Sequence, residues 1–332
     1  MESALKTIRE MPKIELHLHL EGAIPVELLF EFIKNKNPSE IRNLTELKEK
    51  MKFINFEHFI KTWIWQTKFI NNESYFKDIA YYVLKNLSEQ NVKYVEAFYS
   101  PFDFLKNGIS VQGITENIIE GKEKAYQDFG VKCNLIADLV RDYGAETGKE
   151  RLKLLTPYLG KGIIGIGIGG SEQMFPPAPY AKVYQEAKSL GFRLTAHAGE
   201  AAGAESVWSV IKDLGVERIG HGVRANEDPQ LIEFLAVEQI PLEVCVTSNI
   251  KTGVYKSVHE HPIKDYFSKG LLVTINSDDP TMFNTSITEE FLLLYNELGF
   301  TIDELKELYF NSVDATFLPQ EEKDSLKLLI NT

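Results

Sequence analysis

Eight short apolar runs recur along the chain, and the segments between them have the spacing of amphipathic helices. Helix-stop signals support this pattern: residues 181–190 have helical periodicity and end at Gly191, just before one of the runs. Strands that alternate with helices predict a parallel sheet, and eight of them favour closure into an α/β fold, the (β/α)8 TIM barrel, over an open doubly wound sheet. The expected strands are 14–20, 94–99, 133–140, 162–168, 193–197, 218–221, 241–246 and 271–275.

No low-complexity tract or flexible linker divides the 332 residues, so we expect a single domain over residues 1–332. Residues 25–90 form an aromatic-rich helical insertion after the first strand, which places it at the barrel mouth where active sites lie. We interpret this insertion as a lid, with a structural flap as the alternative. The tail after Pro280 adds two or three helices, one of which begins at the capping box Thr301-Ile302-Asp303-Glu304.

Composition narrows the class of partner. The formal net charge of −12 argues against nucleic acid, because binding to phosphates needs a basic face. No run of about 18 apolar residues predicts a membrane span, and the first residues have no apolar leader. Cys133 and Cys245 lie in apolar runs and are expected to be reduced core residues. We therefore expect a cytoplasmic protein that acts on a small molecule, as a monomer or a small homo-oligomer.

Polar residues gather at the ends of the expected strands. Successive side chains of a strand point to opposite faces, so His17 and His19 share one face of the first strand. His197 ends the fifth strand, His221 the sixth and Asp278 the eighth. Closure of the barrel puts the eighth strand beside the first, so we expect these side chains to meet at one barrel mouth.

Three neutral imidazoles and one carboxylate suit one Zn²⁺ per chain, with Fe²⁺ or Co²⁺ as alternatives. The expected ligands are His17, His19, His197 and Asp278. Each residue also has a plain structural interpretation, such as a hydrogen-bonded histidine pair or an Asp-Asp-Pro turn. Those interpretations would have to hold independently at every strand end, which makes the metal site the better prediction. Zinc lowers the pKa of a bound water to near neutrality and so provides a nucleophile.

Other patterns are interpreted as structural. Gly165–Gly170 satisfies the dinucleotide-binding spacing G-x-G-x-x-G, but a proline-rich stretch follows where that fingerprint opens a helix. A second His-x-His, His259-Glu260-His261, has polar neighbours and precedes Pro262, so we expect a solvated loop or helix start. His58 lies in an expected amphipathic helix and is interpreted as structural.

With these residues assembled, the chain resembles the adenosine deaminase family of metal-dependent amidohydrolases. The resemblance extends from about residue 10 to about residue 315. Any one of its motifs is weak, but the set is specific, and it implies zinc-dependent hydrolytic deamination of a 6-aminopurine. The matching motifs are Pro12–Gly22, Gly169–Glu172, Thr195–Glu200, Arg218–Gly222 and Ser277–Pro280.

The resemblance also implies roles for single residues beyond the four metal ligands. Glu200 matches the proton donor to purine N1, and His221 matches the residue that orients or deprotonates the attacking water. Asp279 matches the group that hydrogen-bonds N7, Gly170 the backbone N–H that meets N3, and His19 faces the substrate as well as the metal. A proton on N1 makes C6 electrophilic, so Glu200 must be protonated, and Asp279 must carry a proton to donate to N7.

Glu21 departs from the family pattern and bears on the substrate. The adenosine-specific branch usually has aspartate here, where it meets the ribose 5′-hydroxyl, while glutamate also occurs in the adenine and aminodeoxyfutalosine branches. Gly170 favours a nucleoside over a free base. We therefore expect a purine nucleoside, adenosine or 2′-deoxyadenosine, to be converted to inosine or 2′-deoxyinosine and ammonia, with Glu21 contacting the substrate. Aminodeoxyfutalosine and adenine are the alternative substrates. A different amidohydrolase would leave Glu200 and Asp279 without a role, and a non-catalytic barrel would be expected to have lost a ligand or the acid, none of which is missing.

Overall fold

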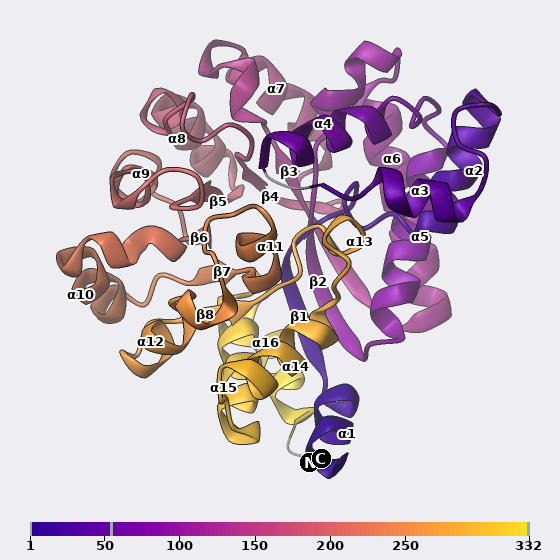
Figure 1. Cartoon of the computed structure of the whole chain (residues 1–332). Coiled ribbons are helices and arrows are strands. Elements are labelled where there is room, and N and C mark those ends of the chain that lie inside the picture. Colours follow the sequence, from indigo (N-terminus) through magenta and orange to yellow (C-terminus); the bar gives the residue numbers. More distant parts are fainter. Residues whose placement is uncertain (1, 54–55, 331–332) are drawn as a thin grey trace.

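The computed structural model describes residues 2–53 and 56–330. Eight parallel strands form a ring in sequence order (Figure 1), and Leu18 pairs with Asp278 where the ring closes. Two backbone hydrogen bonds of 2.9 Å make this closure, from the Asp278 N–H to the His17 oxygen and from the His19 N–H to the Asp278 oxygen. The expected (β/α)8 barrel is confirmed. Its strands are β1 (Lys13–His19), β2 (Val92–Tyr99), β3 (Lys132–Asp138), β4 (Ile163–Gly167), β5 (Arg193–Ala198), β6 (Arg218–His221), β7 (Leu242–Val244) and β8 (Val273–Ile275).

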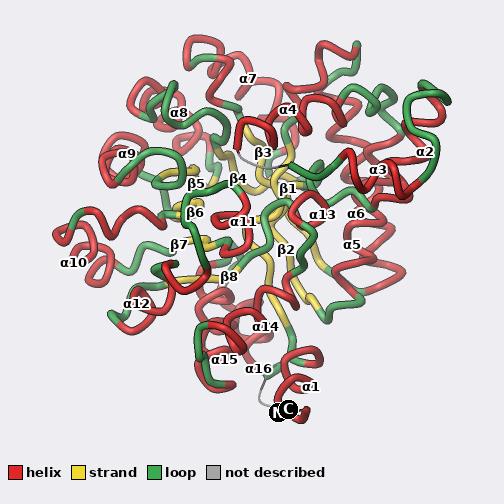
Figure 2. The backbone as a smooth tube through the Cα atoms, in the orientation of Figure 1, coloured by secondary structure: helices red, strands yellow, loops and turns green. Residues whose placement is uncertain are grey.

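Helices surround the ring of strands on its outer side, as Figure 2 shows in red around the yellow strands. The helices that follow strands β2 to β7 are α6 (Val111–Phe129), α7 (Gly148–Leu155), α8 (Ala181–Leu190), α9 (Ala204–Ser209), α10 (Pro229–Glu238), α11 (Val246–Lys251) and α12 (Ile263–Ser268). Helix α9 is followed directly by a π-helical turn, Val210–Leu214.

The alternation of β1 divides its side chains between two buried environments. Leu16 and Leu18 belong to the main hydrophobic core, under the surrounding helices. Glu15 and His17 are equally buried but make polar contacts inside the barrel: Glu15 accepts a hydrogen bond from the Ser277 N–H, and His17 contacts Glu243. The barrel interior therefore carries charge, and each charged group there needs a partner.

The insertion after β1 consists of α2 (Val26–Lys36), α3 (Leu44–Lys50), α4 (Phe56–Thr67) and α5 (Tyr75–Ser88). Residues 54 and 55, which belong to the expected lid, lie outside the described residues. Helix α4 lies over the strand ring in Figure 1, at the end where the strands finish. The position expected for a lid is thus confirmed, while its movement stays a prediction.

The ends of the chain complete the barrel. Helix α1 (Glu2–Glu10) precedes β1, and after β8 come α13 (Pro280–Phe283), α14 (Ile287–Glu297), α15 (Ile302–Ala315) and α16 (Gln320–Leu328). The capping box at the start of α15 is confirmed, with Thr301 and Glu304 each bonding the other's backbone N–H. Helix α15 packs against β8 and β1 and covers the point of closure.

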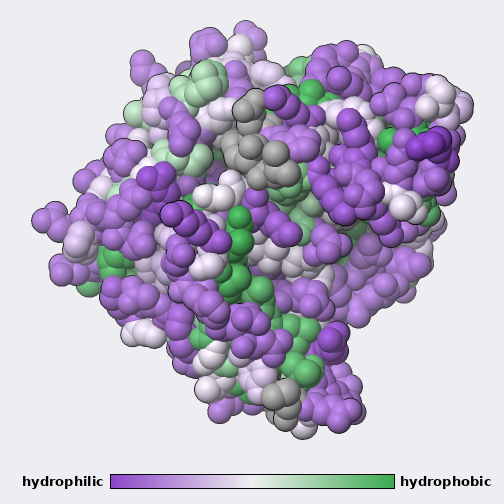
Figure 3. Space-filling view, viewed as in Figure 1, coloured by the Kyte–Doolittle hydropathy of each residue, from purple (hydrophilic) through white to green (hydrophobic). Residues whose placement is uncertain are grey.

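The hydropathy of the surface and of the helices bears on the expectation that no segment spans a membrane. The face in Figure 3 is mostly hydrophilic, and hydrophobic side chains gather in a band near its middle. Within residues 2–53 and 56–330, we find no helix with the length and apolar character needed to cross a membrane.

Candidate functional site

The four residues expected to hold a metal come together at the mouth of the barrel. The Nε2 atom of His19 lies 3.2 Å from Nε2 of His197 and 3.4 Å from Oδ1 of Asp278. The Nε2 atom of His17 lies 3.6 Å from the same Asp278 oxygen. Ligand atoms bound tetrahedrally at zinc–nitrogen distances of about 2.0–2.1 Å are about 3.3 Å apart, so these separations fit one zinc ion.

The protonation of these histidines also fits a metal. The Nδ1 atom of His17 lies 2.7 Å from Oε2 of Glu243, while its buried Nε2 has no hydrogen-bond partner among the described residues. A carboxylate behind a histidine fixes the tautomer that presents its other nitrogen to a metal. Burial lowers the pKa of His19 to about 3 and that of His197 well below its usual value, which keeps both imidazoles neutral as ligands must be.

A network inside the barrel holds Glu243 in place. The buried guanidinium of Arg218 donates from Nε to Glu243 at 2.6 Å and from a second nitrogen to Glu96. The ring of Phe317 stacks on this guanidinium at 3.8 Å. Sequence reasoning missed Glu243 and Arg218 as functional residues; the available signal was a charged side chain inside an otherwise apolar strand.

Two site residues have a strained backbone. His221 and Asp278 both have a φ angle of 62°, in the left-handed region that residues other than glycine seldom adopt. His221 is the last residue of β6, whereas Asp278 follows the end of β8 at Ile275, and the closure hydrogen bonds hold Asp278 in this conformation. Strain of this kind persists where the surrounding structure imposes it, and it aims both side chains into the cavity.

Cys245 lies close to the metal candidates without being one of the expected ligands. Its sulfur lies within 4.8 Å of ligand atoms of His17 and Asp278. Burial raises the pKa of the Cys245 thiol well above its usual value, so the thiolate that a metal would need is disfavoured. Cys245 and Cys133 are both buried and free, as expected for reduced core residues.

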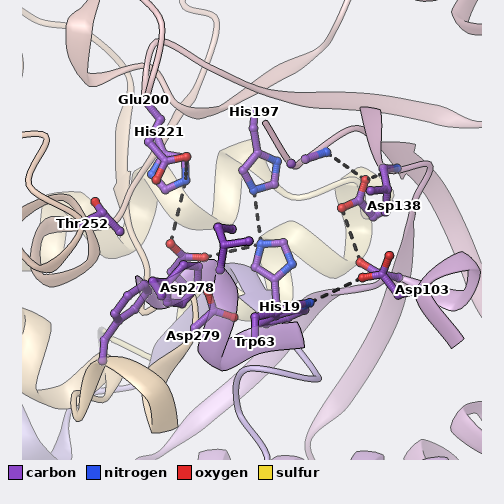
Figure 4. A pocket seen from close by; sticks show the side chains of 17 residues that line it. His19, Trp63, Asp103, Asp138, His197, Glu200, His221, Thr252, Asp278 and Asp279 are labelled. Atoms are coloured by element: carbon purple, nitrogen blue, oxygen red, sulfur yellow. Dashed lines mark hydrogen bonds and ion pairs between the residues drawn. The ribbon is translucent and has the colours of Figure 1, made fainter. Parts of the chain in front are cut away.

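A cavity opens beside the candidate ligands, and His19, His197 and Asp278 line it. Figure 4 shows Glu200, His221 and Asp278 on one side of it, with Asp103 and Asp138 on the opposite side. Helix α4 contributes an apolar wall that includes Phe59 and Trp63, and other lining residues are Ser100, Gly169, Gly170, Thr252, Asp279 and Phe283.

Glu200 has the protonation expected of an acid. Its carboxyl lines the cavity, and its Oε2 lies 3.5 Å from Nε2 of His221. Burial raises the pKa of Glu200 well above its usual value, and the carboxylates of Asp278 and Glu172 raise it further. A carboxyl that stays protonated near neutral pH can donate a proton to a ring nitrogen.

Asp279 has the same character at another point of the cavity. Burial, followed by the charges of Asp278, Glu21 and Glu200, raises the pKa of Asp279 well above its usual value. Its Oδ1 is buried and has no hydrogen-bond partner among the described residues. A β-carbon at Gly22 would overlap the Asp279 carboxyl, so glycine is needed there for Asp279 to occupy this position.

Gly170 also lines the cavity, and its conformation requires glycine. Its φ angle is 101°, and a β-carbon would overlap the carboxylate of Asp142. Glycine is therefore needed at this point of the cavity wall, and the contact of its N–H with a purine stays a prediction.

Glu21 lies behind the cavity wall. It is 1% exposed and is absent from the residues that line the cavity. Its Oε1 accepts a hydrogen bond from the Ser100 N–H, and its buried Oε2 has no partner among the described residues. Ser100 separates Glu21 from the cavity, and a direct contact between Glu21 and substrate stays a prediction.

Glu172 positions the loop that carries Glu200, a role that sequence reasoning missed although it singled out this glutamate. Its carboxylate accepts hydrogen bonds from four consecutive backbone N–H groups, residues 199–202, at 2.7 to 3.2 Å. Such a set of converging N–H groups needs an acceptor that can bond several donors at once, which a carboxylate provides.

Replacing Glu172 with glutamine should disturb this loop. The amide puts an NH₂ group where backbone donors converge, leaving buried N–H groups unpaired, and each costs about 1–3 kcal/mol. We expect a lower free energy of unfolding in a denaturant titration, together with lower activity. Glu233→Gln, at an exposed position on α10, is the matched control and should change neither. Unchanged stability and activity in Glu172→Gln would contradict this role.

The chain is similar in sequence to known deaminases. A family model described as Adenosine deaminase matches residues 12–332. An adenine deaminase of Wolinella succinogenes is 36% identical over 332 residues, covering 99% of this chain and 100% of the relative. An adenosine deaminase of Clostridium botulinum (strain Kyoto / Type A2) is 33% identical over 328 residues, covering 97% and 98%.

The chain is also similar in structure to a solved deaminase and a solved amidohydrolase. A crystal structure of adenine deaminase from Arthrobacter aurescens has a TM-score of 0.92 and 30% identity, covering 97% of this chain and 98% of the other. An amidohydrolase from Burkholderia ambifaria, solved with bound Zn, has a TM-score of 0.91 and 25% identity, covering 100% and 94%.

Proposed function

We propose that this chain, which belongs to the adenosine deaminase family, hydrolyses adenosine or 2′-deoxyadenosine to inosine or 2′-deoxyinosine and ammonia. It is a hydrolytic deaminase that acts on a carbon–nitrogen bond. The observation that carries the proposal is that Glu200 and Asp279, two carboxyls with raised pKa, line one cavity with the histidine cluster. Two protonated carboxyls are what recognition of purine ring nitrogens requires.

We infer that one zinc ion is held by His17, His19, His197 and Asp278, whose spacing suits tetrahedral coordination. The bound Zn of the Burkholderia ambifaria amidohydrolase supports this choice. When bound, zinc would lower the pKa of a water molecule so that hydroxide is available near neutral pH.

The side chains then divide the work of deamination. Glu200 donates its proton to purine N1, which draws electrons from C6, while Asp279 donates a hydrogen bond to N7. His221 faces both Glu200 and Asp278, with Nε2 lying 3.5 Å and 3.9 Å from their carboxylate oxygens, so it can orient the water that attacks C6. The water oxygen bonds to C6, and the bond from C6 to the amino nitrogen breaks. One proton of the water completes the departing ammonia. The other returns to Glu200, whose own proton stays on N1 of the product.

The far wall of the cavity favours a nucleoside over free adenine. Asp103 accepts hydrogen bonds from the Tyr143 hydroxyl at 2.7 Å and from the Trp63 indole at 3.5 Å. Asp138 accepts backbone N–H groups through Oδ1, and its Oδ2 lies 3.5 Å from the Ser100 hydroxyl. Carboxylates on this wall can accept hydrogen bonds from sugar hydroxyls, which adenine lacks.

Adenine remains the second candidate, because the relatives from Wolinella succinogenes and Arthrobacter aurescens are named adenine deaminases. Aminodeoxyfutalosine is the third candidate substrate, because glutamate at position 21 also occurs in the branch that acts on it.

A substrate panel tests the proposal. With metal-loaded protein, we expect kcat/KM for adenosine or 2′-deoxyadenosine to exceed that for adenine and aminodeoxyfutalosine by about tenfold or more, a difference of about 1.4 kcal/mol. Ammonia release and the loss of absorbance on deamination measure the rates. A tenfold preference for adenine or aminodeoxyfutalosine would overturn the substrate, and inactivity towards all four compounds would overturn the function.

The Asp103→Asn variant sharpens this test. Because a hydrogen bond to a charged group contributes about 1.5–3 kcal/mol, the variant should lower kcat/KM for adenosine by about 10- to 100-fold. The rate with adenine should stay nearly unchanged, since adenine has no sugar to reach this wall. Equal losses for both substrates would remove the argument for a sugar subsite here.

A further inference from the structure

We propose that Asn249 and His261 are positioning residues that set which ring nitrogen of His221 carries the proton, so that its Nε2–H points into the cavity. A chain of hydrogen bonds connects the three side chains: Nε2 of His261 lies 3.1 Å from Oδ1 of Asn249, whose Nδ2 lies 3.2 Å from Nδ1 of His221. The importance of these hydrogen bonds for catalysis rests on the proposed function.

The environment of His261 corrects the sequence-based expectation. His261 was expected in a solvated loop or helix start, but it is only 4% exposed. Its ring packs against Tyr255, with centroids 5.2 Å apart. The partner of the motif, His259, has a side chain that is 69% exposed, so the two histidines of one motif have opposite environments. Burial of His261 requires that its two ring nitrogens find partners.

A backbone N–H determines which atoms donate and which accept in this series of hydrogen bonds. The Ile263 N–H lies 3.3 Å from Nδ1 of His261, and because a backbone nitrogen can only donate, Nδ1 must accept. Burial lowers the pKa of His261 to about 3, so the ring is neutral and its single proton is on Nε2.

The proton on His261 in turn determines the orientation of the Asn249 side-chain amide. The Nε2–H of His261 needs an acceptor, which places the Asn249 oxygen towards His261 and the Asn249 NH₂ group towards His221. An amide nitrogen is also only a donor, so Nδ1 of His221 accepts and the proton of the neutral His221 ring is on Nε2. Asn249 is itself fully buried, and its backbone bonds Cys245 and Tyr255, which restricts the side chain to this position.

The consequence concerns what His221 offers to a water in the cavity. With the proton on Nε2, His221 donates a hydrogen bond, which orients the oxygen lone pairs of the attacking water. The opposite tautomer would present a lone pair on Nε2 and turn a water hydrogen towards the ring instead. Asn249 and His261 thus act through His221, and neither lines the cavity.

Asn249→Asp reverses the last link of the chain with almost no change in size. A carboxylate accepts from both neighbours, so the proton of His221 should move to Nδ1 and leave Nε2 without one. We expect kcat to fall by about 10- to 100-fold while KM changes little. This is at most the lower end of the about 10²–10⁴-fold that a positioned acid or base contributes, because the His221 ring itself is retained. His261→Phe removes the donor to Asn249, so both amide orientations become available and a smaller loss of kcat with a mixture of tautomers is expected.

Long-range ¹H–¹⁵N spectra of metal-loaded protein, labelled at its seven histidines, measure the tautomers directly. A His221→Gln variant assigns the His221 signals. His259→Phe is the matched control, which should lose only the signals of His259 and leave those of His221 and kcat unchanged. Melting curves and metal content confirm that each variant is folded and loaded. If Asn249→Asp does not fold, the wild-type spectrum and His261→Phe decide the question.

The outcomes separate this inference from the proposed function. A wild-type His221 protonated on Nδ1, or on both nitrogens, would overturn the inference even if the enzyme deaminates adenosine. An unchanged His221 signal in Asn249→Asp would overturn it as well. Inactivity towards every compound of the substrate panel would overturn the proposed function, yet the spectra would still show whether Asn249 and His261 fix the tautomer.

Discussion

Glu200→Gln should retain its metal and lose turnover. Glutamine has nearly the shape of glutamic acid but cannot supply a proton to purine N1, and general acid–base groups contribute about 10²–10⁴-fold to rate. Glu200 is absent from the four-residue cluster that fits a zinc ion, so metal binding should persist. We expect kcat for adenosine to fall by about 10²-fold or more, measured by ammonia release, with metal content unchanged by elemental analysis.

The control for this substitution is Glu233→Gln, which makes the same chemical change on an exposed face of α10 and should behave as wild type. Retention of more than about a tenth of the wild-type rate would show that Glu200 is not the acid, given the range expected of such groups. Loss of metal together with activity would show instead that Glu200 supports the metal centre.

His19→Ala should lose metal and activity together. The Nε2 atom of His19 is the one that lies closest to both His197 and Asp278, so alanine leaves a three-ligand site with an open side. Substituting groups that merely support a ligand weakens metal affinity about 10- to 100-fold, and removal of a ligand should weaken it at least as much. We expect elemental analysis to find little metal after dialysis and the deaminase rate to fall in proportion.

His259→Ala is the matched control for His19→Ala, because its side chain is 69% exposed and lies outside the cavity. Excess zinc should restore part of the activity of His19→Ala if weakened affinity is the cause. Full metal content in dialysed His19→Ala would remove His19 from the ligand set.

The number and order of the strands could be predicted, because the apolar pattern of a strand or helix can be recognised within a short segment of sequence. All eight expected strands exist, and the alternation of His17 and His19 with leucines correctly placed both imidazoles towards the barrel mouth. The last two strands are shorter than expected, since β7 ends at Val244 instead of 246 and β8 begins at Val273 instead of 271. The residues left out, at 245–246 and 271–272, are apolar, so hydrophobicity alone could not indicate these boundaries.

The residues that support the site could not be predicted in the same way. Arg218 and Glu243 meet only because the strands that carry them are adjacent and face the same interior. The burial of His261 depends on Asn249 in α11 and on Tyr255 after that helix, and no local pattern indicates that they approach it. Partners of this kind are set by tertiary packing, and a single sequence carries no periodic signal for them.

Residues 315–317, between α15 and α16, affect when the site can take its final form during synthesis. Phe317 donates its N–H to Glu96, its ring covers the Arg218 guanidinium, and the carbonyl of Ala315 accepts from Arg218. The support beneath His17 is therefore incomplete until residues near the end of the chain are in place. During synthesis on the ribosome, the carboxylate of Glu243 that faces His17 can reach its final position only after residues 315–317 have been made.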